Sequence, residues 1–330
     1  QVEVHTTFIG GGFGRRVLGD FVAEAVEIAR EFTVPVKLVW TREDDMQHGF
    51  YRQQTVHRLR GSLNDQNQVQ WWAHKQIAAG TSTVLMPPAI ASLLPESMPT
   101  ASRTSVANWM GNQSLSWLGA FQAREGAEEL SYSFPSRNFE QVTYDPGMPV
   151  SIWRSVGNSY NAFAVESFVD ELASLAAADP LEFRRSYLTD DSECLDVLAR
   201  LEKVASWGQS APGIGQGMAI FRSFGAVVGQ VADVSVDNAG TIRVHRVCCV
   251  VDCGSVFNPD IVRQQRESGI ILGLTAALHG EINMDAGRIR QSNYHDYRML
   301  RLAHSPAIDV HINNSDREPV GVGEPGTPPI

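Results

Sequence analysis

The stretch Gly10-Gly11-Gly12-Phe13-Gly14-Arg15-Arg16 decides how the chain begins to fold. Residues 1–9 before it alternate in polarity, which predicts a strand, and residues 21–32 after it place apolar side chains on one helical stripe. Pro35 should end that helix before a second strand over 36–41. A glycine loop between strand and helix leaves backbone N–H groups open to an anion. It is neither a Walker loop nor a complete dinucleotide fingerprint, because Arg15 stands where the third glycine should fall, so a tight structural turn remains an alternative.

Further along, the chain predicts a helix-rich half and a hairpin. The segment 81–149 is rich in Ser, Thr and Pro without sustained periodicity, and we expect irregular covering structure there or a crossover between the two halves. We predict helices over 162–177, 180–187 and 260–278, paired strands over 230–237 and 241–251 joined by Asn238-Ala239-Gly240, and a last strand over 308–312. The prediction is a mixed α+β (α/β) fold with two mixed-sheet subdomains, 1–150 and 151–330.

Bulk composition describes an ordinary globular protein. The chain has 330 residues, 43% of them hydrophobic and 19% charged, enough for two modest domains. A net charge of −10 argues against a nucleic-acid partner. No apolar run is long enough to cross a bilayer, and no secretory signal is visible. Both ends look truncated, so the sequence leaves open whether the protein is cytoplasmic, periplasmic or membrane-associated.

The cysteines and histidines do not form a metal-binding pattern. Cys248, Cys249 and Cys253 crowd one apolar stretch in which a strand would alternate their faces, and Cys194 stands alone. This spacing fits neither zinc nor an iron-sulfur cluster, so buried core positions are the expectation. We therefore predict no protein ligand to a metal and no iron-sulfur cluster in this chain.

Two later turns offer side chains for chemistry. Trp153-Arg154-Ser155-Val156-Gly157 places a cation at a helix entrance, and Gly321-Val322-Gly323-Glu324-Pro325-Gly326 presents one carboxylate on a rigid turn. A carboxylate can act as a general base when burial raises its pKa. Taken singly, a surface arginine and an ordinary turn glutamate are equally compatible with these segments.

The order of these segments resembles the xanthine dehydrogenase and aldehyde oxidase superfamily. The glycine loop, the Trp-Arg-Ser-Val-Gly turn, Ser223-Phe224-Gly225-Ala226, Asn258-Pro259 and Gly323-Glu324-Pro325 follow in the family's order. They look most like the branch of isoquinoline 1-oxidoreductase large (beta) subunits and membrane-associated aldehyde dehydrogenases. That branch carries a Met-Gly-Gln-Gly segment which this chain lacks, as expected for a fragment.

The resemblance implies a molybdenum hydroxylase whose metal is held by molybdopterin cytosine dinucleotide. It assigns Glu324 as the general base, Gly11 and Gly12 to the pterin, Phe13 and Gly14 to the substrate side of the metal, and Arg154 with Ser155 to the region of its oxo group. Gln265, Gly225 and Ala226 match further cofactor contacts. The implied substrate is an N-heteroaromatic compound or an aldehyde, oxidised with water as oxygen source. The implied partner is a small [2Fe-2S] subunit, with a cytochrome electron acceptor left open.

One departure bears on the substrate. Where xanthine-oxidising members place a substrate-binding glutamate, this chain has Arg15-Arg16-Val17, which disfavours a purine and favours a less polar molecule. Trp153 could stack on an aromatic substrate or pack inside the protein. A nucleotide-dependent dehydrogenase remains an alternative, although no acidic residue ends the second predicted strand. A non-catalytic relic of the same fold is the other alternative.

Overall fold

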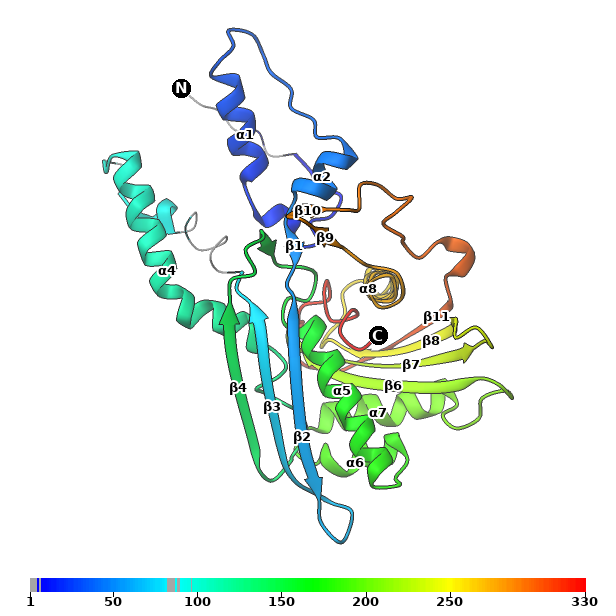
Figure 1. Ribbon diagram of the computed structural model, residues 1–330. Coiled ribbons are helices and arrows are strands. Elements are labelled where there is room, and N and C mark those ends of the chain that lie inside the picture. The colour runs from blue at the N-terminus through cyan, green and yellow to red at the C-terminus, as the bar shows by residue number, and fades with distance from the viewer. Residues whose placement is uncertain (1–4, 6, 82–86, 88–89, 96) are drawn as a thin grey trace.

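The computed structural model describes residues 5, 7–81, 87, 90–95 and 97–330, with the backbone alone over 111–122, and it contains two main sheets (Figure 1). The first has the order β2-β3-β4, antiparallel and then parallel. The second has the order β11-β8-β7-β6, with β11 parallel to β8 and the other pairs antiparallel. The strands are β2 (Thr55–Leu63), β3 (Val69–Ala79), β4 (Arg137–Tyr144), β6 (Gly215–Ser223), β7 (Ala226–Val236), β8 (Ile242–Asp252) and β11 (Ala307–Asn313). The predicted mixed α+β class with two mixed sheets is confirmed.

Helices cover both faces of the four-stranded sheet. Because side chains alternate along a strand, Val227 of β7 belongs to the core that contains α7, while Val228 belongs to the core that contains α8. Cys248 and Cys249 divide between the two cores in the same way, and all four cysteines are buried thiols, as predicted. The helices are α1 (Asp20–Ala29), α2 (Arg42–His48), α4 (Thr100–Arg124), α5 (Asn158–Leu175), α6 (Pro180–Tyr187), α7 (Ser192–Ala205) and α8 (Pro259–Leu278).

Local capping signals explain why several predicted elements are confirmed. The Asp179 side chain accepts hydrogen bonds from the backbone of Leu181 and Glu182 at the start of α6, and Asn258 caps α8 ahead of Pro259. The helix predicted over 21–32 forms as α1, the one over 162–177 as α5, and the hairpin as β7 and β8. The last predicted strand forms as β11.

Three predictions about the first half need correction or lie outside the described residues. Residues 36–41 are extended but unpaired with any strand in the described part of the chain, so the predicted β-loop-α-β unit is wrong, because a strand needs a hydrogen-bonding neighbour. The segment 81–149 is not irregular throughout, since it contains α4 and β4. The strand predicted over 1–9 falls partly outside the described residues, and residues 7–9 form no strand.

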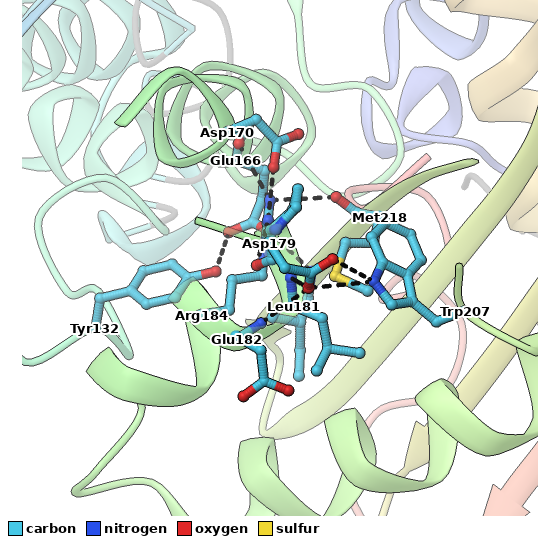
Figure 2. A network of polar contacts seen from close by, with 11 residues as sticks. Tyr132, Glu166, Asp170, Asp179, Leu181, Glu182, Arg184, Trp207 and Met218 are labelled. Atoms are coloured by element: carbon cyan, nitrogen blue, oxygen red, sulfur yellow. Dashed lines mark hydrogen bonds and ion pairs between the residues drawn. The ribbon is translucent and has the colours of Figure 1, made fainter. Parts of the chain in front are cut away.

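A buried ion pair joins the first helices of the second half to the four-stranded sheet (Figure 2). Arg184 of α6 is fully buried and its Nε lies 3.0 Å from Oε2 of Glu166 in α5. Glu166 also accepts hydrogen bonds from the Tyr132 hydroxyl at 2.7 Å and from the backbone of Ile220 in β6 at 2.9 Å. Each acceptor of the carboxylate is thus used, which offsets the cost of burying both charges.

Short pairings complete the fold. β1 (Tyr51–Arg52) pairs in parallel with β5 (Val150–Ser151), and β9 (Met284–Asp285) pairs with β10 (Arg288–Ile289). None of the helices in the described part of the chain is sufficiently long and apolar to span a bilayer. The predicted boundary between 150 and 151 remains a prediction.

Candidate active site around the Glu324 turn

The turn that carries Glu324 lies against α8 because two glycines of that helix allow a close approach. A Cβ at Gly269 would stand 3.0 Å from the carbonyl carbon of Gly326, and one at Gly273 would stand 2.2 Å from Cγ2 of Ile330. From the sheet, the Gln230 side chain donates a hydrogen bond to the Gly326 carbonyl at 2.9 Å. Helix and sheet therefore fix the turn from two sides.

Arg154 joins three segments of the site. The residue is 6% exposed, and its Nε donates to the carbonyl of Gly323, directly before Glu324, at 2.8 Å. Nη1 donates to the Ser268 hydroxyl at 2.9 Å, and Nη2 donates to Oε1 of Gln265 at 3.0 Å. Nη2 also contacts the Gly323 carbonyl. A planar guanidinium can make such a set of contacts at once.

The backbone beside Arg154 is strained, and the strain places a second contact on the turn. Ser155 and Val156 have φ values of 76° and 48°, which β-carbon-bearing residues rarely adopt. In this conformation the Ser155 hydroxyl donates to the Glu324 carbonyl at 2.8 Å.

The Trp153 ring is covered by Arg52, whose Cζ lies 4.3 Å from the ring centroid. Trp153 therefore has a packing partner within the protein.

The Glu324 carboxyl has the properties expected of a base. Burial raises its pKa, while the charge of Arg154 and a hydrogen bond from the Ser155 backbone act in the opposite direction. Its Oε2 atom is buried and accepts no hydrogen bond from the described part of the chain. A buried oxygen with an open lone pair can accept a proton from a bound molecule.

The glycine loop reaches this site through its last residues. Gly14 has φ of 96°, and a Cβ there would stand 2.2 Å from the Ile152 carbonyl oxygen, so the loop lies against the segment before Arg154. The half-exposed Phe13 ring has its centroid 5.8 Å from Cζ of Arg154. Gly11 and Gly12 lie earlier on the same loop.

Gly225 and Ala226 flank the turn from the start of β7. Gly225 has φ of 79°, and a Cβ there would stand 3.0 Å from Cγ1 of Val320, four residues before Glu324. Ala226 is fully buried as the first residue of the strand. The structure thus gathers Phe13, Gly14, Arg154, Ser155, Gln265 and Glu324 around one turn, with Gly225 and Ala226 beside it.

Two residues near the turn were not predicted from the sequence. Arg266 is fully buried and contacts the Val322 carbonyl. Glu125 follows the last residue of α4, and its pKa is raised to about 7 by burial and by the charge of Glu324. Glu125 lies in the segment expected to be irregular, and no local pattern marks it.

Comparison with known proteins identifies the family of the chain. Two models of the molybdopterin cofactor-binding domain match residues 1–101 and 163–306. The chain is 30% identical to isoquinoline 1-oxidoreductase subunit beta of Brevundimonas diminuta over 331 residues, which is 99% of this chain and 39% of that protein. It is 29% identical to a membrane-bound aldehyde dehydrogenase of Gluconacetobacter polyoxogenes, covering 99% of this chain and 43% of that protein. The chain therefore spans about two fifths of the length of these relatives.

The fold itself is shared with solved enzymes. Quinoline 2-oxidoreductase from Pseudomonas putida 86 superposes with a TM-score of 0.75 at 13% identity, covering 97% of this chain and 63% of that one. Aldehyde oxidoreductase from Desulfovibrio gigas gives a TM-score of 0.67 at 14% identity, covering 97% and 50%. With both cofactor-binding models matched and relatives aligned along nearly the whole sequence, this chain belongs to the molybdopterin-binding subunits of the xanthine dehydrogenase and aldehyde oxidase superfamily.

Proposed function

We propose that this chain is the catalytic part of a molybdenum hydroxylase, which oxidises an N-heteroaromatic compound or an aldehyde with water as the source of oxygen. The observation that carries the proposal is the buried, unpartnered Oε2 of Glu324 beside Arg154. The relatives' names, which include isoquinoline and quinoline oxidoreductases and aldehyde-oxidising enzymes, support the substrate classes. Arg15-Arg16-Val17 in place of a substrate-binding glutamate supports a less polar substrate than a purine.

The residues present fit a molybdenum-pterin cofactor. The backbone N–H groups of Gly11, Gly12 and Phe13 have no acceptor in the described part of the chain, so they are free to bind an anionic or polar ligand edge. Gln265 would present its amide nitrogen to the ligand, because its Oε1 is already held by Arg154. We propose the cytosine dinucleotide form, with Ser155, Gly225 and Ala226 as the other contacts. When bound, the group supplies the redox chemistry by accepting two electrons from the substrate carbon.

The roles of the protein side chains follow from their contacts. Glu324 takes the proton of the attacking oxygen, since Oε2 has an open lone pair and burial favours proton uptake. Arg154 holds the base in place through the Gly323 carbonyl, and its charge opposes the rise in the pKa of Glu324 that burial causes. Phe13, half-exposed next to Arg154, supplies an apolar wall for an aromatic or aldehyde substrate.

The electrons taken from the substrate need an acceptor, and we expect no iron-sulfur cluster in this chain. We propose a small [2Fe-2S] subunit as partner, with a cytochrome as the further acceptor in a membrane-associated assembly. Bacterial relatives are compatible with a cytoplasmic or a periplasmic enzyme. We further propose that cofactor binding is divided between residues 1–150 and 151–330.

The experiment is elemental analysis for molybdenum, with acid release of bound nucleotide, on the full-length protein co-produced with its [2Fe-2S] subunit. Near-stoichiometric molybdenum and a cytidine nucleotide are expected. Glu324→Gln should keep the metal and lose turnover by about 10²- to 10⁴-fold, the usual contribution of a general base. Glu318→Gln, exposed six residues earlier, is the matched control and should change neither.

Other outcomes identify the alternatives. A well-folded protein that stays free of molybdenum and binds NAD tightly would favour a nucleotide-dependent dehydrogenase. Molybdenum-loaded protein whose turnover is insensitive to Glu324→Gln would remove Glu324 as the base. Loaded protein with no turnover on any aldehyde or N-heterocycle would favour the non-catalytic relic.

A further inference from the structure

Glu125 is held by the N-terminal end of α5, and the segment just before this helix holds the Glu324 turn. The Asn161 side chain of α5 donates to the Ala123 carbonyl at 2.8 Å and to the Glu125 carbonyl at 2.9 Å, which fixes the end of α4. Asn158 donates to Oε2 of Glu125 at 3.2 Å. Because α5 begins at Asn158, three residues after Ser155, which binds the Glu324 carbonyl, both glutamates are held by the segment that leads into this helix.

Glu125 also lines a hollow that borders the candidate cofactor contacts. The hollow has a volume of about 680 Å³, and its wall includes Asn158, Phe224 and Gly225. This size is typical of small-molecule sites. Phe224 is 40% exposed, so it offers an aromatic face to a ligand. A Cβ at Gly225 would stand 3.0 Å from Cγ1 of Val320, so the hollow adjoins the segment that leads into the Glu324 turn.

We propose that Glu125 is a second functional carboxyl group of this site and that, when protonated, it donates a hydrogen bond to an acceptor atom of the substrate next to the carbon that is oxidised. The inference rests on the proposed function. Such an acceptor is the ring nitrogen of an N-heteroaromatic compound or the carbonyl oxygen of an aldehyde. Attack on the neighbouring carbon shifts negative charge onto that atom, and a positioned donor stabilises the charge.

The electrostatic surroundings favour the protonated form of Glu125. Burial, followed by the charge of Glu324, raises the pKa of Glu125 to about 7, and the Gly157 backbone N–H opposes this rise. A carboxyl group with that pKa still carries its proton in much of the population at neutral pH. The other charged or titratable groups around Glu125 and the hollow are Glu129, Tyr132, Arg137, Tyr160, Asp190, Asp191 and Arg222.

Arg222 does not neutralise Glu125, because its guanidinium is already bound to two other acids. It lies 2.5 Å from Asp191 and 2.6 Å from Glu193. Glu129 and Asp190 carry negative charge on the same wall, and Arg137 carries positive charge there. The donor form of Glu125 should therefore prevail below pH 7 and be lost as the pH rises through about 7.

The test compares quinoline with naphthalene, which has the same shape but no ring nitrogen, on the full-length, cofactor-loaded enzyme between pH 6 and 9. Dissociation constants are measured by quenching of tryptophan fluorescence, a readout independent of turnover. For the unaltered protein, quinoline should bind roughly 10-fold more tightly at pH 6 than at pH 9, the effect of one hydrogen bond. Naphthalene binding should not change with pH.

Two variants separate the donor from a structural role. Glu125→Gln keeps an N–H donor that does not titrate, so quinoline binding should become independent of pH. Glu125→Met removes the donor, so quinoline and naphthalene should bind alike at every pH. Glu129→Gln, exposed on the same wall, is the matched control and should retain the pH dependence.

The proposal is overturned if unaltered protein does not prefer quinoline at pH 6, or if Glu125→Gln retains the pH dependence. This result is distinct from failure of the proposed function. An enzyme that contains molybdenum and turns over an N-heterocycle, yet shows no such preference, refutes only the role of Glu125. An enzyme without molybdenum or turnover refutes the proposed function itself.

Discussion

Replacing Arg154 by lysine tests whether this side chain holds the Glu324 turn in place. Arg154 donates to the Gly323 carbonyl, to Ser268 and to Gln265, while remaining 6% exposed. A lysine ammonium keeps the charge but is compact and cannot reach all three acceptors. Two acceptors should lose their donor, at about 1 to 3 kcal/mol each. We therefore expect the turn to lose about 2 to 5 kcal/mol of local stability, since water can replace part of the missing hydrogen bonds.

Hydrogen exchange measured by mass spectrometry gives the local value directly. With about 1.4 kcal/mol for each tenfold change, peptides covering residues 320–327 should exchange at least about 30-fold faster in Arg154→Lys. Arg263→Lys on α8 is the matched control, because Arg263 makes an exposed ion pair with Asp260 at 2.8 Å and such pairs contribute little. If both variants exchange equally in this segment, Arg154 does not hold the turn and the reasoning is refuted.

Three further predictions concern packing, burial and pH. Gly273→Ala should destabilise the protein by about 1 to 3 kcal/mol in thermal melts, because the new Cβ would stand 2.2 Å from Cγ2 of Ile330. The control Gly217→Ala places its Cβ in open space and should leave the stability unchanged. Equal melting temperatures for the two variants would contradict this. Glu166→Gln leaves the buried Arg184 without its main counter-charge and should cost about 3 to 5 kcal/mol in urea unfolding, unlike Glu182→Gln, whose partner Arg185 is a surface group. Burial lowers the pKa of His57 and His74 to about 4, so the unfolded chain binds protons that the folded chain does not, and stability should fall as the pH drops from about 6.5 to about 4. The melting temperature of His74→Gln should therefore depend less on pH in that window. If its melting temperature changes with pH as steeply as that of the unaltered protein, these histidines are not the cause.

Elements with strong local signals could be predicted from the sequence, and elements that depend on distant partners could not. Asn258-Pro259 and Asp179-Pro180 mark helix starts through capping that operates within four residues. Helix α4 mixes polar and aromatic residues without an apolar stripe, so its sequence lacks the usual periodic signal. Residues 36–41 have a strand-like composition, but strand formation requires a neighbour that the local sequence does not specify.

In the candidate site, too, the local motifs could be predicted from the sequence and their meeting in space could not. Gly14, Arg154 and Glu324 are separated by 140 and 170 positions, and no spacing rule brings such residues together. Their motifs are individually compatible with ordinary turns, and only the order of motifs shared with a family predicted their convergence. Glu125 belongs to no such motif, so the burial and charge that distinguish it became visible only in the folded chain.

The distribution of backbone strain argues that the convergence is more than a packing detail. Among the described residues, eight other than glycine have positive φ, and four of them, Phe13, Ser155, Val156 and Phe224, lie in segments around the Glu324 turn. Each such residue costs on the order of 1 to 3 kcal/mol unless its surroundings impose the conformation. Here the surroundings do so, since Arg154 and the Ser155 hydroxyl bind the backbone of the turn. Strain maintained beside a carboxylate with an unpartnered oxygen is the arrangement expected of a site prepared in advance for a ligand.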